Sequence, residues 1–339
     1  CGRLDLAPAH QGTGYNLTGQ DPPTSTWGAN IFPAADGQSW HMLAAEFENH
    51  CDISKWSPNS AIVHAVSASG PLGPYARAGV AVPPFAHNPK VVRAPDGTWL
   101  MYTIGVTADP SSLVNCSKVR NGRGATTDGL DPKPGRTPEN HESNITLFTA
   151  PSVSGPWSKF GVVLGPDWEG TWDEDTSNPS PWVLSNGTVL LMYRGCIVDD
   201  GCASKICGCR EEYIGISSAP HWSGPYTRLQ KTSILPSAPA EDPSLWVDRR
   251  GHFHFLMHYL GPESGSLVAR HGFSRTFRGP WQIHLDSIPY DTTVAFSDGT
   301  NVTFHKRERP HLVWGADGNP THLVTGVVQP GANEHGYSG

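Results

Sequence analysis

The sequence contains no run of 18 apolar residues, and only 16% of its 339 residues are charged. Without a long apolar run, we expect no helix that spans a membrane. Lysine and arginine are scattered along the chain, and the formal net charge is -7 at pH 7. The chain therefore lacks the basic footprint that favours nucleic acid or an anionic membrane surface, and we expect it to bind neither.

Proline, glycine and tryptophan are abundant instead. The chain has 31 Pro, 37 Gly and 12 Trp, a composition that suits many short strands joined by turns and suits long helices poorly. We therefore predict an all-β protein. No linker-like stretch divides the chain, so residues 1–339 are predicted to form a single domain.

Seven cysteines and five N-glycosylation sequons predict a secreted, extracellular glycoprotein. The chain also begins at Cys1 without an initiator Met, as expected for a processed secreted protein. The cysteine spacing in CIVDDGCASKICGC matches no standard zinc pattern, so disulfides are expected there. Because the cysteine count is odd, Cys1 is the natural residue to pair outside the chain. The sequons start at Asn16, Asn115, Asn144, Asn186 and Asn301, and the disulfide candidates are Cys51, Cys116, Cys196, Cys202, Cys207 and Cys209.

A repeated pattern organises the chain. In each of four segments a proline precedes a glycine by eight positions, around a turn between two apolar runs, which predicts a β-hairpin. A fifth, weaker copy has Ala29 in the proline position and Gly37 in the glycine position. Gly-Pro-aromatic steps follow most copies and are predicted to open the fourth strand of each repeat. The proline and glycine pairs are Pro89 and Gly97, Pro179 and Gly187, Pro243 and Gly251, and Pro310 and Gly318.

Hairpin, third strand and fourth strand make one four-stranded sheet per repeat. The sequence thus predicts a five-bladed β-propeller of four-stranded antiparallel blades. Residues 106–142 form an insertion that either shapes a cleft, contacts a partner or has no function. The predicted blades cover residues 25–77, 86–160, 176–230, 240–285 and 307–339, and residues 1–24 are expected to close the last blade.

The five repeats, their strand-opening DP and RP steps and the Gly-Pro-aromatic turns resemble the five-bladed propeller glycosidases. These are glycoside hydrolase families 43, 62, 32 and 68, and the resemblance covers nearly the whole chain. It implies a carbohydrate ligand at one end of a central axis, where the innermost strand of each blade begins. It also implies three carboxylates there: an Asp as base or nucleophile, a second Asp as stabiliser, and a Glu as general acid.

Mapped onto the family 43 pattern, the first Asp position falls on Gly28, the second on Asn178, and the acid on Glu241. Neither glycine nor an amide can act as base or nucleophile. Asp175 lies three residues before Asn178 and could replace a missing carboxylate. The alternative is purely structural: Asp242 would cap the turn before its strand, and Glu241 would pair with a neighbouring arginine.

A second mapping, in which the site positions fall on different repeats, is also open. The EDP step resembles the stabilising step of families 32 and 68, and the ERP step resembles the acid/base step of family 68. Asp242 would then be the stabiliser and Glu308 the acid, with the nucleophile position on Asn88 or Asn178. Both mappings therefore lose the base or nucleophile.

Aromatic and imidazole side chains near the mapped positions are candidates for ligand contacts. We predict Trp27 as a sugar platform and His87 as a polar pocket residue, with Asn88 and Asn178 beside the ligand. No cofactor is expected; a structural metal ion on the axis is left open, since the histidines form no standard ligand set.

Two functions remain open. The missing aspartates favour a non-catalytic protein, either a glycan binder or a structural subunit of an extracellular assembly held through Cys1 or exposed loops. The alternative is an active furanosidase-type glycoside hydrolase, with Glu241 as general acid and a displaced Asp as base.

Overall fold

The computed structural model describes residues 15, 24–105, 113–116, 143–167, 172–198, 209–261 and 268–330. Within these ranges the regular structure is almost entirely β-strand, so the predicted all-β class is confirmed. The short helical turns are the 3₁₀ helices η1 (Glu48–His50) and η2 (Ile53–Lys55) and the helix α1 (Trp56–Asn59). None of the described helices is long and apolar enough to cross a membrane.

The chain divides into two compact units. Unit 1 contains residues 1–2, 90–107 and 131–289, and unit 2 contains residues 3–89, 108–130 and 290–339. The prediction of a single domain stays a prediction.

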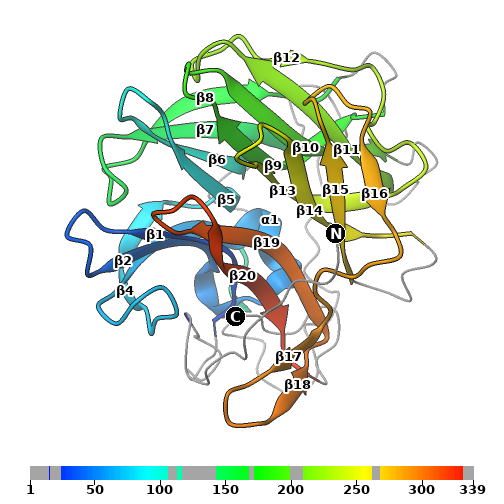
Figure 1. Ribbon diagram of the computed structural model, residues 1–339. Helices are drawn as coiled ribbons and strands as arrows, with labels where there is room; N and C mark the ends of the chain where they lie inside the picture. The colour runs from blue at the N-terminus through cyan, green and yellow to red at the C-terminus, as the bar shows by residue number, and fades with distance from the viewer. Residues whose placement is uncertain are drawn as a thin grey trace. The chain divides into compact units, whose positions relative to one another are not determined.

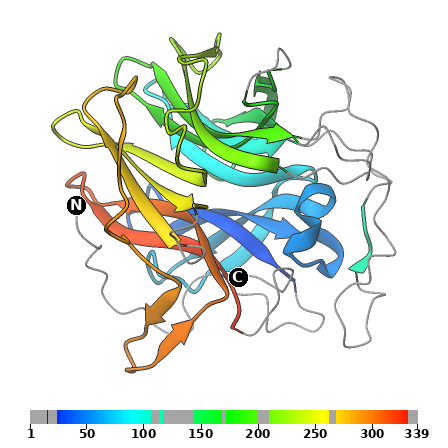
Figure 2. The same ribbon diagram turned by 90° about the vertical axis from the view of Figure 1, so that its right-hand side faces the viewer.

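Four antiparallel sheets of four strands each are blades of the β-propeller type (Figure 1). In each blade, strands that follow one another in sequence are neighbours in the sheet, and Figure 2 shows their twist. The blades are β1 (Thr26–Pro33), β2 (Trp40–Phe47), β3 (Ser60–Ser67) and β4 (Ala76–Val82); β5 (Ala86–Arg93), β6 (Trp99–Gly105), β7 (Asn144–Ala150) and β8 (Ser158–Leu164); β9 (Asp175–Val183), β10 (Val189–Val198), β11 (Cys209–Ala219) and β12 (Thr227–Arg228); and β13 (Ala240–Val247), β14 (Phe253–Tyr259), β15 (Val268–Ser274) and β16 (Gln282–His284).

The last repeat differs from the prediction. Among the described residues it forms a two-stranded sheet of β19 (Lys306–Trp314) and β20 (Pro320–Val328). A separate two-stranded sheet, β17 (Thr293–Ala295) and β18 (Asn301–Thr303), precedes it. The described residues thus form four four-stranded blades where five were predicted. The expected closing segment, residues 1–24, lies almost wholly outside the described part of the chain.

The backbone nevertheless repeats five times. Each residue before the proline position has a left-handed backbone, with φ between 46° and 61°. Register shifts interrupt strand pairing at this point in four of the repeats, which marks a β-bulge. Only glycine adopts this conformation without a steric cost, so the four non-glycine cases are unusual. The five residues are Gly28, Asn88, Asn178, Asp242 and Arg309.

Apolar side chains pack between neighbouring blades of unit 1. Met192, Ile216 and Phe255 belong to a cluster that joins the β9–β12 and β13–β16 sheets. A second cluster joins the β5–β8 and β9–β12 sheets, and there the hydroxyls of Tyr102 and Tyr226 lie 2.6 Å apart. These contacts fix the starts of the inner strands β9 and β13 within one packed unit.

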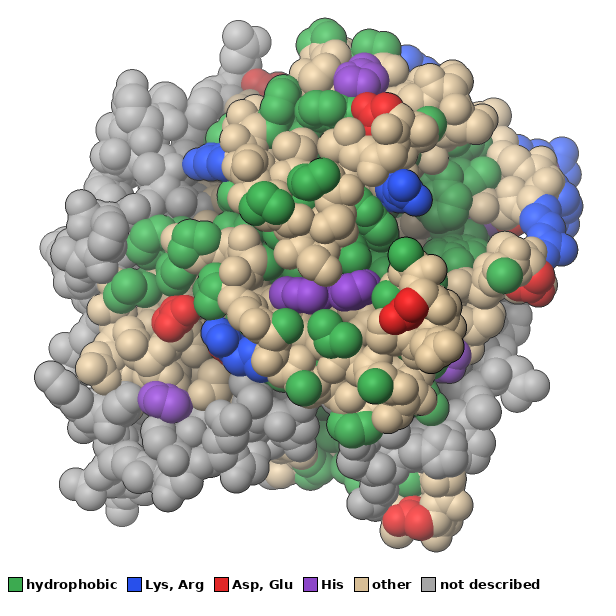
Figure 3. All heavy atoms as spheres, turned by 90° about the vertical axis from the view of Figure 1, so that its left-hand side faces the viewer, with side chains coloured by type: hydrophobic (Ala, Val, Ile, Leu, Met, Phe, Trp, Pro, Cys, Tyr) green, Lys and Arg blue, Asp and Glu red, His purple; other side chains and the backbone are tan. Residues whose placement is uncertain are grey.

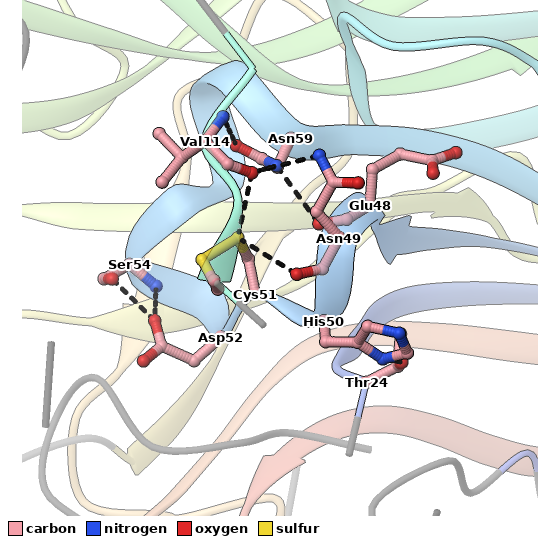
Figure 4. The surroundings of a disulfide bond; sticks show 10 residues. Thr24, Glu48, Asn49, His50, Cys51, Asp52, Ser54, Asn59 and Val114 are labelled. Carbon is pink, nitrogen blue, oxygen red and sulfur yellow. Dashed lines mark hydrogen bonds between the residues drawn. A yellow bond between two sulfur atoms is a disulfide. The ribbon is translucent and has the colours of Figure 1, made fainter. Parts of the chain in front are cut away.

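A disulfide in unit 2 joins Cys51 to Cys116 (Figure 4). The side chain of buried Asn59 holds Val114 beside it, donating to the Val114 carbonyl at 2.8 Å and accepting from its N–H at 3.1 Å. Four residues of the predicted insertion, 113–116, are thereby anchored, and the rest of residues 106–142 lies outside the described chain. Cys196 is also disulfide-bonded. Cys1, Cys202 and Cys207 lie outside the described residues, as does the side chain of Cys209.

Charged side chains are spread thinly over the face drawn in Figure 3. Lys and Arg side chains of the described residues occupy separate places there rather than one continuous basic patch. This distribution agrees with the scattered basic residues of the sequence.

Candidate functional site

A polar cluster forms in unit 1 where the inner strands β9 and β13 begin. The Asn178 amide Nδ2 donates to Asp242 Oδ1 at 2.8 Å and to Glu241 Oε2 at 3.3 Å. On the neighbouring strand β14, His258 Nδ1 lies 3.1 Å from Glu241 Oε1. Glu241 is therefore held as a hydrogen-bond acceptor between two blades, and it, Asp242 and Asn178 are brought together.

The backbone bulge explains how two successive carboxylates serve one cluster. In a regular strand, Glu241 and Asp242 would point to opposite faces. The left-handed conformation of Asp242 breaks this alternation, and pairing shifts between Glu241 and Ser244. Asn178 has the same conformation on β9. Strained non-glycine residues of this kind are concentrated at functional sites.

Arg194 joins the cluster, although it belongs to none of the sequence motifs. Its guanidinium lies 2.9 Å from Glu212 Oε1, 3.7 Å from Asp175 Oδ1 and 3.9 Å from Glu241 Oε2. Burial lowers the pKa of Arg194, but the Glu212, Asp175 and Glu241 charges outweigh it and raise that pKa above its usual value. One largely buried cation, 13% exposed, therefore lies within 4 Å of three carboxylates. The sequence did carry one signal for Arg194, because it is a charged residue inside the otherwise apolar run VLLMYRGCIV.

A second buried network fixes the segment that leads into β9. Asp173 accepts from the Tyr193 hydroxyl and from Arg228 Nε, each at 2.7 Å, and its side chain is 1% exposed. Burial, and secondly the Asp173 charge, raise the pKa of Tyr193 well above its usual value. The ring of Trp172 lies over Gly195 and Gly215, where a Cβ atom would come within 2.3 Å and 2.6 Å of it. This packing sets the position from which Asp175 and Asn178 follow.

Three groups of the unit 1 cluster could together contact a cation. Ligand atoms of Glu241, Asp242 and His258 lie within 4.8 Å of one another. Oxygen and imidazole ligands suit several divalent ions, so the set names no particular metal. It stays a geometric possibility, as the sequence left it.

Unit 2 places His87 and Asn88 at the start of β5. His87 Nδ1 lies 2.8 Å from Ser60 Oγ, and its ring packs beside Trp56 and Phe47. Burial, and secondly the Arg309 charge, hold the pKa of His87 well below its usual value, so the imidazole is neutral at pH 7. His87 is therefore a buried neutral side chain, 2% exposed, and its role as a polar pocket residue stays a prediction.

Gly28, the other residue mapped to an aspartate, has no room for a side chain. A Cβ atom on Gly28 would lie 2.8 Å from Asn88 Oδ1. Its left-handed backbone, with φ of 61°, also favours glycine. An aspartate at this position would require Asn88 to move.

Two further predicted site residues of unit 2 are buried. Trp27 is 2% exposed, and its ring packs against Gly326, where a Cβ atom would approach within 2.8 Å. It therefore has no free face for a sugar, and the platform prediction does not fit the structure. Glu308 is 4% exposed at the start of β19, and Lys306 Nζ lies 3.8 Å from its Oε1.

The sequons differ in accessibility. Asn115, Asn186 and Asn301 are exposed, whereas Asn144 is half-buried and accepts a hydrogen bond from Thr146 Oγ1 at 2.7 Å. Asn16 lies outside the described residues.

Known proteins that are similar to this chain show which fold carries the site. No family model and no curated protein matches the chain. A family 117 glycoside hydrolase from the marine bacterium Zobellia galactanivorans is 14% identical, with a TM-score of 0.61 over 99% of this chain and 88% of that one. The chain has the fold of the β-propeller glycoside hydrolases. The resemblance seen in the sequence is thus confirmed at the level of the fold.

Two more solved structures support the same propeller glycosidase fold. A thermostable family 43 glycoside hydrolase is 11% identical, with a TM-score of 0.57 over 94% of this chain and 86% of that one. An endo-arabinase from Bacteroides thetaiotaomicron is 10% identical, with a TM-score of 0.56 over 97% of this chain and 96% of that one. At such identities the likeness extends to the fold and not to the chemistry of the site.

Proposed function

We propose that this chain is a glycan-binding protein with the propeller glycosidase fold, and that it does not hydrolyse its ligand. The observation that carries the proposal is the hydrogen bond from Asn178 Nδ2 to Asp242 Oδ1. An amide occupies the position that the family 43 mapping gives to an aspartate, and it donates to the neighbouring carboxylate. An amide can orient a ligand, but it has no charge with which to fill the stabilising role of that aspartate. The base or nucleophile position of the same mapping is Gly28, which has no acidic group at all.

The remaining side chains of the unit 1 cluster suit sugar hydroxyls. Glu241 and Asp242 provide carboxylate oxygens, which accept from hydroxyl groups, and His258 adds an imidazole on the same cluster. Hydrogen bonds to charged groups are worth about 1.5–3 kcal/mol each. Arg194 keeps the carboxylates in place through charge, as described above.

Glu241→Gln tests this proposal. We expect wild-type protein to bind one of a panel of arabinan, xylan and fructan oligosaccharides without releasing reducing sugar. Loss of the charged acceptor should weaken that binding by about 10- to 100-fold in titration calorimetry. Glu211→Gln is the matched control, because Glu211 accepts from the Tyr213 hydroxyl instead of joining the cluster. Equal binding by wild type and E241Q would contradict the proposal.

Hydrolysis is the second candidate function, and one observation favours it. Asp175 and Glu241 both lie within 4 Å of the Arg194 guanidinium, at 3.7 Å and 3.9 Å. A displaced carboxylate is thus near the predicted acid. Release of reducing sugar that disappears in both D175N and E241Q would establish this function in place of simple binding.

We also propose that the protein is secreted and N-glycosylated, and that an extracellular partner or self-assembly uses Cys1 or exposed loops. Exposed Asn186 and Asn301 and the Cys51–Cys116 disulfide support secretion. In a eukaryotic secretory host, we expect N-glycosidase to lower the mass of the secreted protein. A doubly substituted N186Q/N301Q protein should lose two glycans from that mass shift; an unchanged mass would contradict the assignment.

A further inference from the structure

Arg270 on β15 is a buried cation with an incomplete set of partners. It is 5% exposed, and its Nη1 donates to the adjacent Ala269 carbonyl at 3.0 Å. Among the described residues, its buried Nε–H has no acceptor. Within the described part of the chain, no carboxylate forms an ion pair with it. A buried charge is costly without a counter-charge, so this arrangement needs an explanation.

The surroundings of Arg270 are apolar on one side. Its guanidinium carbon lies 5.4 Å from the centre of the Tyr259 ring. Arg270 pairs in register with Met257, and both Met257 and Tyr259 belong to the apolar cluster between the β9–β12 and β13–β16 sheets. Stacking on an aromatic ring satisfies the face of a guanidinium but leaves its edges for acceptors.

The two hydrogen-bonding edges of the guanidinium are used unequally. Nη1 is engaged by Ala269, whereas the edge formed by Nε and Nη2 carries no hydrogen bond within the described chain. Two parallel N–H groups on one edge match the two oxygens of a carboxylate, or two oxygens of a sulfate. The Tyr259 ring lies beside the guanidinium, 5.4 Å from its central carbon, and provides a cation–π contact.

We propose that Arg270 is an oxyanion-binding residue, which recognises a carboxylate or sulfate group through its Nε–Nη2 edge. The group belongs either to an acidic sugar or to a free anion, since both present the same oxygens. Within the described chain, no ion pair or hydrogen bond joins Arg270 to Glu241, Asp242 or Asn178. The inference therefore does not rest on glycan binding at Glu241.

Arg270→Met is the decisive variant, because it keeps an unbranched apolar side chain over Tyr259 and removes the charge. Thermal unfolding of the full chain is measured in chloride buffer at fixed ionic strength, then with sodium galacturonate, sodium sulfate or neutral galactose. For the wild type, we expect an oxyanion at ten times its Kd to raise Tm by about 2–4 °C. R270M should show no specific rise with either oxyanion, and R270K should show a smaller one because it lacks the fork.

The Tm measured in chloride buffer without oxyanion distinguishes anion binding from a structural role of Arg270. If Arg270 is kept for an external anion, R270M without oxyanion should unfold at the same temperature as the wild type or higher. A lower Tm for R270M, with equal oxyanion responses in both proteins, would overturn the proposal. A response to galacturonate alone identifies an acidic sugar as the source; equal responses to sulfate and galacturonate identify a free oxyanion.

One internal anion is tested in the same experiment. Glu263 precedes Arg270 by seven residues and lies outside the described chain. If E263Q lowers Tm in chloride buffer and removes the response to oxyanions in the same way as R270M, the chain supplies its own anion and the proposal fails. If E263Q behaves like the wild type, the external site stands.

Discussion

Replacing Arg194 with methionine is expected to lower the free energy of unfolding by about 3–5 kcal/mol at pH 7. The guanidinium lies within 4 Å of three carboxylates, and its side chain is only 13% exposed. Without it, Glu212, Asp175 and Glu241 would repel one another in a largely buried place. Urea unfolding followed by tryptophan fluorescence measures the loss.

The pH dependence of that loss identifies its cause. Carboxylates that repel one another take up protons more readily than isolated ones, so R194M should regain stability relative to the wild type as pH falls toward 4. R194K keeps the charge and should lose less. R194M/E212Q removes one repelling carboxylate and should recover part of the loss. A loss for R194M that is below 1 kcal/mol, or that does not change with pH, would show that the carboxylates do not depend on Arg194.

Asp173→Asn is expected to cost about 3–5 kcal/mol, because it breaks a buried ion pair from one side. The carboxylate is 1% exposed and accepts from both Tyr193 and Arg228. Arg228 would remain largely buried, and it would keep its hydrogen bond to the Gly165 carbonyl, at 2.6 Å, and the nearby Asp167 charge. Chemical unfolding of the purified variant at pH 7 gives the magnitude.

A double-mutant cycle tests whether Tyr193 shares this network. Y193F alone removes one hydrogen bond and should cost about 1–2 kcal/mol, since the ring remains packed in its apolar cluster. If Asp173 links the two partners, the costs of D173N and Y193F should not add. Additive costs would contradict a shared network.

The hairpins and their turns could be predicted because their signals are local. The proline and glycine spacing fixes where each first hairpin begins and turns, and the Gly-Pro-aromatic steps mark the last strands. The last repeat lacks these later signals after Gly318, and only β19 and β20 are found there among the described residues. The short motifs were therefore enough to predict the fold class. They were not enough to predict how many blades have all four strands.

The candidate site was predicted only in part, because its contacts join residues far apart in sequence. Glu241, Asp242 and Asn178 were identifiable from their place in the repeat. Arg194, Glu212 and the partners of Asp173 carry no motif, and they meet the site only through strand pairing and blade packing. Trp27 shows the reverse error. Its position beside a mapped site residue predicted a sugar platform, but the side chain is only 2% exposed.

The left-handed residue before each proline position has an evolutionary consequence. Glycine, asparagine, aspartate and arginine all adopt the same backbone there, with φ between 46° and 61°. Selection can therefore exchange the side chain without rebuilding the strand that carries it. A single base change converts an asparagine codon to an aspartate codon, so Asn178 is one mutation from the carboxylate of the hydrolase pattern. The side chain presented at this position can therefore change while the scaffold persists.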